Sequence, residues 1–312
     1  MALRVVALAG GVGGAKLADG LASILTPEEL TIVVNTADDF EHLGLTICPD
    51  LDTVTYTLAG LANPLTGWGR AGETWTFLDT LQRAGAPTWF RIGDLDLLHH
   101  LERTARLRRG ETLTQVTRSL AAHLGARAAI LPMSDDAVRT IVLTEEGDLA
   151  FQNYFVERSC APRVLGFRFE GGSVARPAPG VLESLQRAEV VVLCPSNPWV
   201  SLDPILSLRG VRQALDGRRV VGVSPIVRGA ALKGPAAKMY EELGQAPSAL
   251  AVARHFGGIL QAMVIDEQDA ELATAIEAFG IAVLQAPTIM RNREDRRRLA
   301  GELLTFATQA RA

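Results

Sequence analysis

The chain has 312 residues, of which 48% are hydrophobic and 21% charged, and its formal net charge is −4. This length allows one large domain or two ordinary ones, and the slight acidity disfavours nucleic acid or an anionic membrane as a partner. No run approaches the ~20 apolar residues that cross a bilayer, and no secretion signal is evident. The three cysteines lack metal-ligand spacing. A cytoplasmic protein with reduced cysteines is therefore expected.

The first predicted strand, residues 5–8, ends at a glycine-rich turn, and a helical pattern over residues 14–25 follows. The turn contains four glycines within five residues: Gly10, Gly11, Gly13 and Gly14. Glycines at such a turn let the backbone approach a ligand closely, and the N-terminus of the following helix favours an anion such as phosphate. The same glycines are also typical of a tight strand–helix connection without a ligand, so the turn alone leaves both interpretations open.

The turn matches neither of the two common nucleotide-binding fingerprints. A Walker loop requires Gly-Lys-Ser/Thr, but Lys16 is followed by Leu17, which has no hydroxyl for a metal. The dinucleotide pattern Gly-x-Gly-x-x-Gly is also incomplete, because Ala15 and Lys16 follow the last glycines. A standard ATPase and a nicotinamide-dependent oxidoreductase are therefore disfavoured.

Further apolar runs predict the rest of a sheet. They are residues 30–34, 128–131, 190–193, 220–223, 262–265 and 281–284. Most are apolar throughout, as in strands that are buried on both faces. Helical patterns separate several of them, at residues 181–188, 211–215, 236–243 and 270–279. This alternation predicts an α/β fold, a Rossmann-like doubly wound and mostly parallel sheet, in a single domain over residues 1–312.

Two segments depart from this alternation. Residues 53–125 are expected to form a helical insertion, with helices at residues 73–84, 95–108 and 112–124. Residues 141–170 alternate enough to predict antiparallel strands or a β-hairpin excursion. Both segments are placed to cover the edge of the sheet where a ligand would bind.

Polar segments follow the predicted strands, at residues 10–14, 35–39, 132–136, 195–198 and 224–229. In a parallel sheet these loops meet at one carboxyl edge, where open α/β folds bind ligands. Four carboxylates, Asp38, Asp39, Asp50 and Asp52, lie within fifteen residues. Because carboxylates repel phosphate unless a cation intervenes, we expect a Mg²⁺ site, although helix capping also explains paired aspartates.

Several basic residues are candidates for contacts with phosphate oxygens: Lys16, Arg91, Arg228, Lys233 and Lys238. A solvated surface position explains any one of them equally well. His99 and His100 are adjacent, so we expect them to point to different sides of a helix and to serve as packing or surface residues.

Together these motifs resemble one family. The run Gly-Gly-Val-Gly-Gly-Ala-Lys-Leu at residues 10–17 and Asn-Thr-Ala-Asp-Asp at residues 35–39 closely resemble the 2-phospho-L-lactate transferase family (CofD/FbiA). Further matching segments are residues 47–53, 67–69, 93–96, 133–136, 151–152, 195–198, 224–226 and 233–238. One departure is Leu95, which stands where the family has arginine in a Gly-Asp-Arg-Asp motif.

The resemblance implies a reaction and its substrates. The family transfers a phospholactyl-type group from a guanosine diphosphate-activated donor to a ribityl hydroxyl of the deazaflavin Fo. GMP is released with the help of Mg²⁺, and the product leads to coenzyme F-420. The donor acid implied is lactate, enolpyruvate or glycerate, and the family suggests a homodimer.

The resemblance also implies site residues. Those implied for the nucleotide are Gly10, Gly11, Gly13, Gly14, Lys16, Pro195, Ser196, Asn197 and Ser224. Those implied for Fo are Asp50, Asp52, Thr53, Arg91, Asp94, Met133 and Ser134, and those for the metal are Asp38, Asp39 and Asp50. Asp50 is the expected catalytic residue, which either orients or deprotonates the hydroxyl of Fo or binds the metal.

Two other classes of protein remain as alternatives. A nucleotide-sugar-binding regulatory protein of the gluconeogenesis-factor type resembles this fold and its glycine-rich start. An oxidoreductase on a dinucleotide-binding fold is disfavoured by the incomplete glycine fingerprint. A cleft large enough for an aromatic acceptor would favour the transferase.

Overall fold

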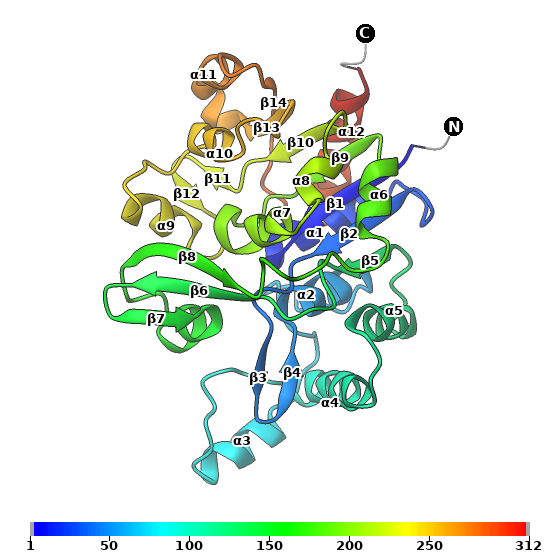
Figure 1. Ribbon diagram of the computed structural model, residues 1–312, viewed down its shortest axis with the longest axis vertical. Helices are drawn as coiled ribbons and strands as arrows, with labels where there is room; N and C mark the ends of the chain where they lie inside the picture. The colour runs from blue at the N-terminus through cyan, green and yellow to red at the C-terminus, as the bar shows by residue number, and fades with distance from the viewer. Residues whose placement is uncertain (1–2, 310–312) are drawn as a thin grey trace.

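The computed structural model describes residues 3–309, and a seven-stranded parallel sheet forms its centre (Figure 1). The strand order is β14-β13-β10-β9-β1-β2-β5. The strands are β1 (Val5–Ala9), β2 (Leu30–Val34), β5 (Ala129–Pro132), β9 (Val190–Leu193), β10 (Arg219–Val223), β13 (Ala262–Asp266) and β14 (Ala282–Ala286). Each predicted strand is present within two residues of its expected bounds, and the α/β Rossmann-like fold is confirmed.

Each strand places side chains in two separate cores. Val6 and Leu8 of β1 pack on one face of the sheet, whereas Val5, Ala7 and Ala9 pack on the other. The second face is covered by helices α1 (Gly11–Ala22), α2 (Pro49–Leu58), α5 (Leu113–His123) and α12 (Arg293–Gln309). The first face is covered by α6 (Val181–Arg187), α7 (Asp203–Ser207), α8 (Val211–Ala214), α10 (Ala249–His255) and α11 (Ala273–Glu277). Burial on both faces explains why the strand sequences are apolar throughout.

The connections reverse direction at β1. The chain passes from β1 to its neighbour β2 and on to β5, and then returns to β9 on the opposite side of β1. Loops that leave the carboxyl ends of β1 and β9 therefore diverge, and open α/β sheets bind ligands in the crevice that this creates.

The segment between β2 and β5 forms the part of the molecule that lies below the sheet in Figure 1, and two of its helices, α2 and α5, pack on the sheet. It contains β3 (Phe40–His42), β4 (Leu45–Ile47), α2, α3 (Thr76–Arg83), α4 (Asp94–Arg108) and α5. The β3–β4 hairpin was not predicted, because its strands have only three residues each. Its turn residues Leu43 and Gly44 both have positive φ, as the favoured two-residue hairpin turns require.

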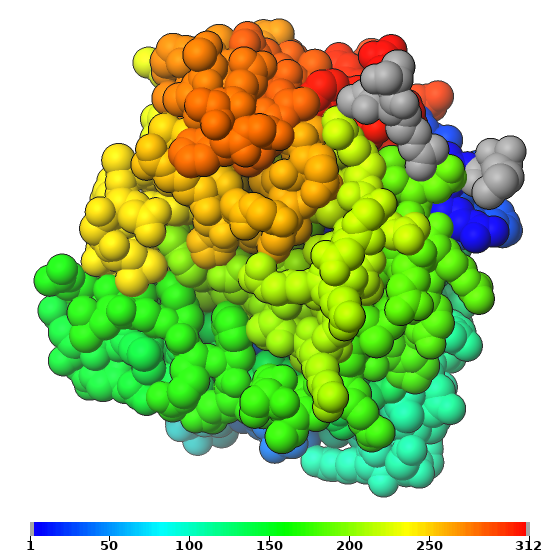
Figure 2. Space-filling model, turned by 45° about the horizontal axis from the view of Figure 1, so that its top comes forward, coloured from blue at the N-terminus to red at the C-terminus, as the bar shows by residue number. Residues whose placement is uncertain are grey.

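A three-stranded antiparallel sheet follows β5. It has the order β7-β6-β8 and consists of β6 (Arg139–Thr144), β7 (Gly147–Ala150) and β8 (Val164–Glu170). Between β7 and β8 the chain forms a short π-helix, η1 (Asn153–Glu157), where the alternating pattern of residues 149–156 favoured a strand. Figure 2 shows this sheet in green beside α9 (Ala236–Glu242) in yellow. The Glu242 carboxylate accepts a hydrogen bond of 3.0 Å from the Val164 N–H.

The remaining short elements are η2 (Pro198–Leu202), β11 (Ile226–Val227), β12 (Ala230–Ala231) and η3 (Glu267–Leu272). Over residues 3–309, none of the helices combines the length and apolar character that a membrane crossing requires.

Candidate active site

A cavity of about 720 Å³ lies at the carboxyl ends of the central strands. Loops that follow β1, β2, β9, β10 and β14 contribute to its wall, as do the segment between β2 and β5 and the start of η1. Of the residues predicted for the site, those that line the cavity are Gly10, Gly11, Gly13, Lys16, Asp38, Asp50, Asp52, Thr53, Arg91, Pro195, Ser196, Asn197 and Ser224. These segments are distant in the sequence, and they meet at the carboxyl edge of the sheet, where the connections reverse direction at β1.

The glycine run forms the first turn of α1 rather than a loop before it. Helix α1 begins at Gly11, three residues before the predicted start. The Gly10 N–H donates to Ser196 Oγ at 3.0 Å, and the Gly11 N–H donates to Asp50 Oδ1 at 2.7 Å. The first N–H groups of an α-helix have no partner within the helix, and this applies to those of Val12 and Gly13, two residues that also line the cavity.

Close packing accounts for several of these glycines. A Cβ atom on Gly13 would lie 2.3 Å from the carbonyl oxygen of Pro195, and one on Gly10 would lie 2.5 Å from Asp50 Oδ2. A Cβ atom on Gly14, which does not line the cavity, would lie 2.4 Å from Ser196 Oγ. The glycines therefore let α1 pack closely against the β9 loop and Asp50.

Asp50 lies in the first turn of α2 and is held from two sides. Its Oδ1 accepts from the Gly11 N–H, and its Oδ2 accepts from Asn35 Nδ2 at 3.0 Å. Burial raises the pKa of Asp50 to about 6, although both hydrogen bonds act in the opposite direction. The residue expected to be central to the chemistry thus connects the glycine turn with the loop after β2.

Asp38 and Asp39 are buried beside Asp50. Burial and the charge of Asp50 raise the pKa of Asp38, which lines the cavity. Burial raises the pKa of Asp39 to about 7, but Asp39 does not line the cavity. One oxygen of each carboxylate, Oδ1, has no hydrogen-bond partner among the described residues. The strand β3, not a helix, follows them, so the helix-cap interpretation is wrong for this pair.

The donor set can be compared with what a metal requires. Among residues 3–309, no group of three or more histidine, cysteine or acidic side chains is arranged to hold a metal ion. Asp38 and Asp50 nevertheless place two mutually repelling carboxylates at the cavity wall. Mg²⁺ is bound in proteins by one or two carboxylates that are completed by water and substrate phosphates, so this pair fits it.

Asp52 anchors a second buried network. Its carboxylate forms an ion pair with both terminal nitrogens of Arg103, and His99 Nε2 lies 3.1 Å from Asp52 Oδ1. Burial by itself would raise the pKa of Asp52, but Arg103, assisted by His99 and His100, holds that pKa well below its usual range. The expectation that the two histidines separate to different sides is wrong, because both contact Asp52.

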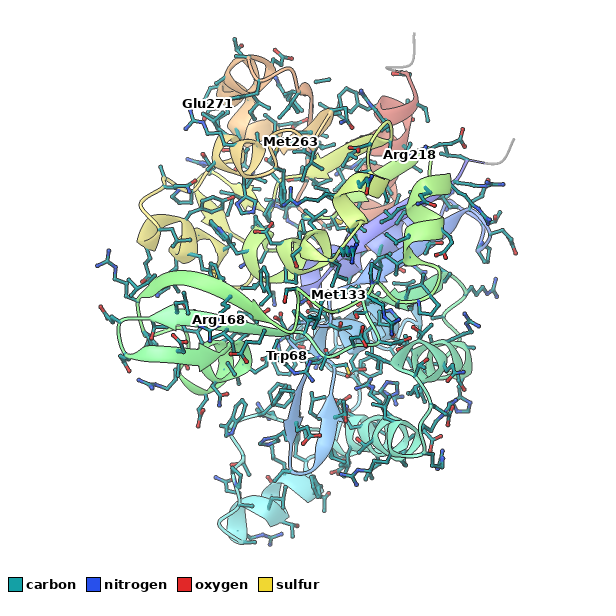
Figure 3. The ribbon with its side chains drawn as sticks, viewed as in Figure 1. Trp68, Met133, Arg168, Arg218, Met263 and Glu271 are labelled. Carbon is teal, nitrogen blue, oxygen red and sulfur yellow. The ribbon has the colours of Figure 1, made fainter. Side chains whose placement is uncertain are left out.

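Several lining residues were missed by sequence reasoning. The Tyr56 hydroxyl donates to Asp96 Oδ1 at 2.6 Å, and both residues border the cavity. Trp89 and Phe90 supply aromatic surface, in addition to Trp68 of the matching segment 67–69 (labelled in Figure 3). The adjacent aromatic residues before Arg91 were the signal in the sequence that could have identified this wall. Their rings give the cavity a flat apolar surface on which an aromatic ring can bind.

Two lysines line the cavity from different segments. Lys16 Nζ donates to the carbonyl oxygen of Met290 at 2.8 Å, and its pKa is lowered by burial and by nearby Arg296 and Lys233. Lys233 Nζ donates to the carbonyl oxygen of Thr66 at 2.7 Å. Of the other candidate cations, Arg91 lines the cavity, whereas Arg228 and Lys238 do not.

Three residues implied for Fo do not reach the cavity. Asp94 accepts hydrogen bonds from the Thr76 and Phe77 N–H groups at the start of α3. Met133 is fully buried in the core between the main and three-stranded sheets (Figure 3). Ser134 Oγ donates to the carbonyl oxygen of Arg176 at 2.6 Å. Their positions are explained by capping and packing, and Leu95 beside Asp94 is 41% exposed.

Comparisons with known proteins place the chain in a family. The family model for 2-phospho-L-lactate transferase CofD matches residues 5–286. A Kitasatospora aureofaciens protein named phosphoenolpyruvate transferase is 41% identical over 318 residues, which cover 99% of each chain. A Methanothermobacter thermautotrophicus protein named 2-phospho-L-lactate transferase is 39% identical over 301 residues, which cover 96% of this chain and 97% of that protein.

A solved structure shares the fold. A member of the UPF0052 family from Bacillus halodurans superposes with a TM-score of 0.63 over 97% of this chain and 99% of that chain. Its sequence identity is 15%, so this likeness shows the fold alone. The family model and the relatives, by contrast, match almost the whole sequence. The chain belongs to the 2-phospho-L-lactate transferase CofD family and is a transferase.

Proposed function

We propose that the protein transfers a phospholactyl-type group from a GDP-activated three-carbon acid to a hydroxyl of the deazaflavin Fo, releases GMP, and acts in coenzyme F-420 biosynthesis. Relatives are named for two different groups, phosphoenolpyruvate and 2-phospho-L-lactate, so lactyl, enolpyruvyl and glyceryl donors are all candidates. The observation that carries the proposal is one cavity lined by two groups of residues. We call the first turn of α1 with Lys16 the glycine end, and Asp52, Asp96, Trp89 and Phe90 the acidic end.

The first end suits the anionic donor. The N-terminus of α1 carries a partial positive charge and offers N–H groups that are not used within the helix. Lys16, fixed on Met290, adds a full charge, and Pro195 and Asn197 extend the wall toward the nucleoside. Such donors stabilise the negative charge that builds on phosphoryl oxygens and on the leaving GMP as the diphosphate bond breaks.

The second end suits the uncharged acceptor. Trp89 and Phe90 provide flat apolar surface for a deazaflavin ring, and Thr53 and Arg91 border the same wall. Arg103 is already paired with Asp52, so its guanidinium is not available to a phosphate group. The two substrates are thereby directed to opposite ends of one cavity.

Asp38 and Asp50 line the same cavity and would hold Mg²⁺. The ion would supply Lewis-acid stabilisation of the developing phosphoryl charge. Asp39, behind the cavity wall, would act through Asp38 rather than through a direct contact with substrate.

Asp50 would also orient or deprotonate the attacking hydroxyl. It is the carboxylate shared by the glycine turn and the loop after β2, and hydrogen bonds to both of its oxygens restrict its orientation. As the new oxygen–phosphorus bond forms, the hydroxyl proton passes to the carboxylate and the diphosphate bond to GMP breaks. General-base catalysis of this kind contributes about 10²–10⁴-fold.

The test is direct synthesis of the product. The protein is incubated with Fo, Mg²⁺ and each of the three guanylylated donors in turn, and mass spectrometry identifies deazaflavin products and GMP. One donor should give a phosphodiester of Fo together with an equal amount of GMP. No product from any donor would overturn the proposal. The family resemblance also implies a homodimer, which light scattering on the same preparation tests.

A further inference from the structure

The acidic end of the cavity contains four contacting polar side chains on two facing helices. Asp52 and Tyr56 lie one turn apart on α2, and Asp96 and His100 lie one turn apart on α4. His100 Nε2 is 3.3 Å from Asp96 Oδ2, and Asp96 Oδ1 accepts from the Tyr56 hydroxyl at 2.6 Å. All four residues line the cavity. We call this set the α2–α4 polar wall.

One nitrogen in this wall has no hydrogen-bond partner within residues 3–309. His100 is 1% exposed, and among the described residues its Nε2 makes no hydrogen bond of acceptable geometry. Its other nitrogen, Nδ1, lies 3.4 Å from Arg103 Nη1. Arginine can only donate, so a hydrogen bond between these two atoms has Nδ1 as its acceptor and assigns the ring proton to Nε2. A buried donor of this kind is costly unless it finds an acceptor.

The charges around the wall determine which acceptor fits. Asp52 is already paired with Arg103, and Asp96 accepts from Tyr56, over whose ring the guanidinium of Arg70 lies at 5.6 Å. The charges around the wall are thereby balanced, so a neutral polar group fits it better than an ion. A hydroxyl group both donates and accepts, so it can accept from His100 Nε2 and donate to Asp96 in the same place.

We propose, on the basis of the proposed function, that the α2–α4 polar wall recognises the hydroxyl-bearing chain of the acceptor. His100 Nε2 and Asp96 contact the hydroxyl groups, and Tyr56 holds Asp96 in position. The wall thus determines specificity, because it distinguishes a deazaflavin with a polyol chain from the bare ring. This role is separate from that of Asp50, which acts at the hydroxyl that is phosphorylated.

The adjacent histidines provide a matched pair of variants. Both contact Asp52, but only His100 lines the cavity. In His100→Asn the amide replaces Nδ1 and the group at Nε2 is lost, whereas in His100→Gln a polar group remains near Nε2. His99→Asn perturbs the same carboxylate without changing the cavity wall.

The measurement is the dissociation constant of each variant for Fo, for the same deazaflavin with a methyl group in place of the ribityl chain, and for GDP. His100→Asn should weaken Fo binding about 3- to 10-fold, the value of one hydrogen bond, and leave the methyl analogue and GDP unchanged. His100→Gln and His99→Asn should keep the wild-type preference for Fo over the methyl analogue. Equal losses in His100→Asn and His99→Asn, or a parallel loss for GDP, would overturn the proposal.

A second variant covers the case in which His100→Asn does not fold. Tyr56→Phe keeps the ring and removes the hydroxyl that holds Asp96, so it should also reduce the preference for Fo over the methyl analogue. An unchanged preference in this variant would count against the wall. If the wild-type protein neither binds Fo nor forms product, the proposed function fails and the wall assignment fails with it. If the wild type forms product and the preference survives every substitution, only the wall assignment is wrong.

Discussion

The two ends of the cavity are built from opposite kinds of sequence signal. At the glycine end the signal is prominent, yet the N–H groups of Gly10 and Gly11 are bound by the protein itself, and Gly13 is required for contact with the β9 loop. At the acidic end the sequence signal is weak, yet the structure has a buried ionic network there, centred on Asp52. A conspicuous motif can thus report a packing constraint, while ordinary residues on two helices create the more unusual chemistry.

The largest expected effect is the loss of turnover on substitution of Asp50, which contacts the glycine turn and the loop after β2. In Asp50→Asn the side chain loses its negative charge, and an amide cannot accept a proton from the hydroxyl or balance a cation. Turnover at saturating Mg²⁺ should fall about 10²–10⁴-fold, as measured by the rate of GMP release. Turnover near the wild-type rate would show that Asp50 is neither the base nor a metal ligand.

The next prediction concerns the acidic end alone. Arg103→Met leaves Asp52 buried without its guanidinium, so the free energy of unfolding should fall by about 3–5 kcal/mol. The control is Arg106→Met on the same helix, where the partner Glu111 is partly exposed and the loss should be at most about 1 kcal/mol. Urea denaturation measures the free energy of unfolding of both variants. Equal losses would show that the buried Asp52–Arg103 pair contributes no more to stability than the partly exposed pair.

A pH dependence follows from Asp39, whose pKa is raised to about 7. The folded state keeps a proton that the unfolded chain releases near pH 4. The resulting stabilisation is complete below that pH and is lost as the pH rises through about 7. Between pH 5 and 8, in the presence of a chelator, the free energy of unfolding should fall by about 2–3 kcal/mol more in the wild type than in Asp39→Asn. Parallel curves for the two proteins would contradict this account.

The smallest effect tests the glycine end. Gly13→Ala drives a Cβ atom against the backbone of Pro195 and should cost about 1–3 kcal/mol of stability without any ligand present. Gly301→Ala in α12, where an added Cβ meets nothing within 4 Å, should instead gain about 0.5–1 kcal/mol. If Gly13→Ala is as stable as the wild type and loses only GDP binding, Gly13 serves the ligand and not the packing.

The sheet could be predicted from sequence because strands buried on both faces are apolar throughout. Val190–Leu193 is an example of such a strand. Because its end was predicted correctly, the position of the loop at residues 195–198 could be predicted as well. The β3–β4 hairpin could not be predicted in the same way, because three-residue strands carry too little periodicity and their turn depends on the positive φ of Leu43 and Gly44.

The candidate site was predictable where its residues follow strands. Asp38 and Ser196 lie in loops that directly follow predicted strands, and Asp50 lies in a motif close to the first of these loops. The Asp96–His100 pair follows from i,i+4 spacing on α4, but the rest of the wall was not predictable, since it depends on how α4 packs against α2. Asp94 illustrates the reverse error: it lies in a family motif, but its hydrogen bonds hold the start of α3.

The division of the cavity into a donor end and an acceptor end is tested most directly by a crystal structure of the protein with Fo and GDP bound together. The electron density should place the diphosphate at the first turn of α1 beside Lys16, and the ribityl chain of Fo along Asp96 and His100. A diphosphate on the α2–α4 polar wall, or Fo bound outside the cavity, would contradict the account.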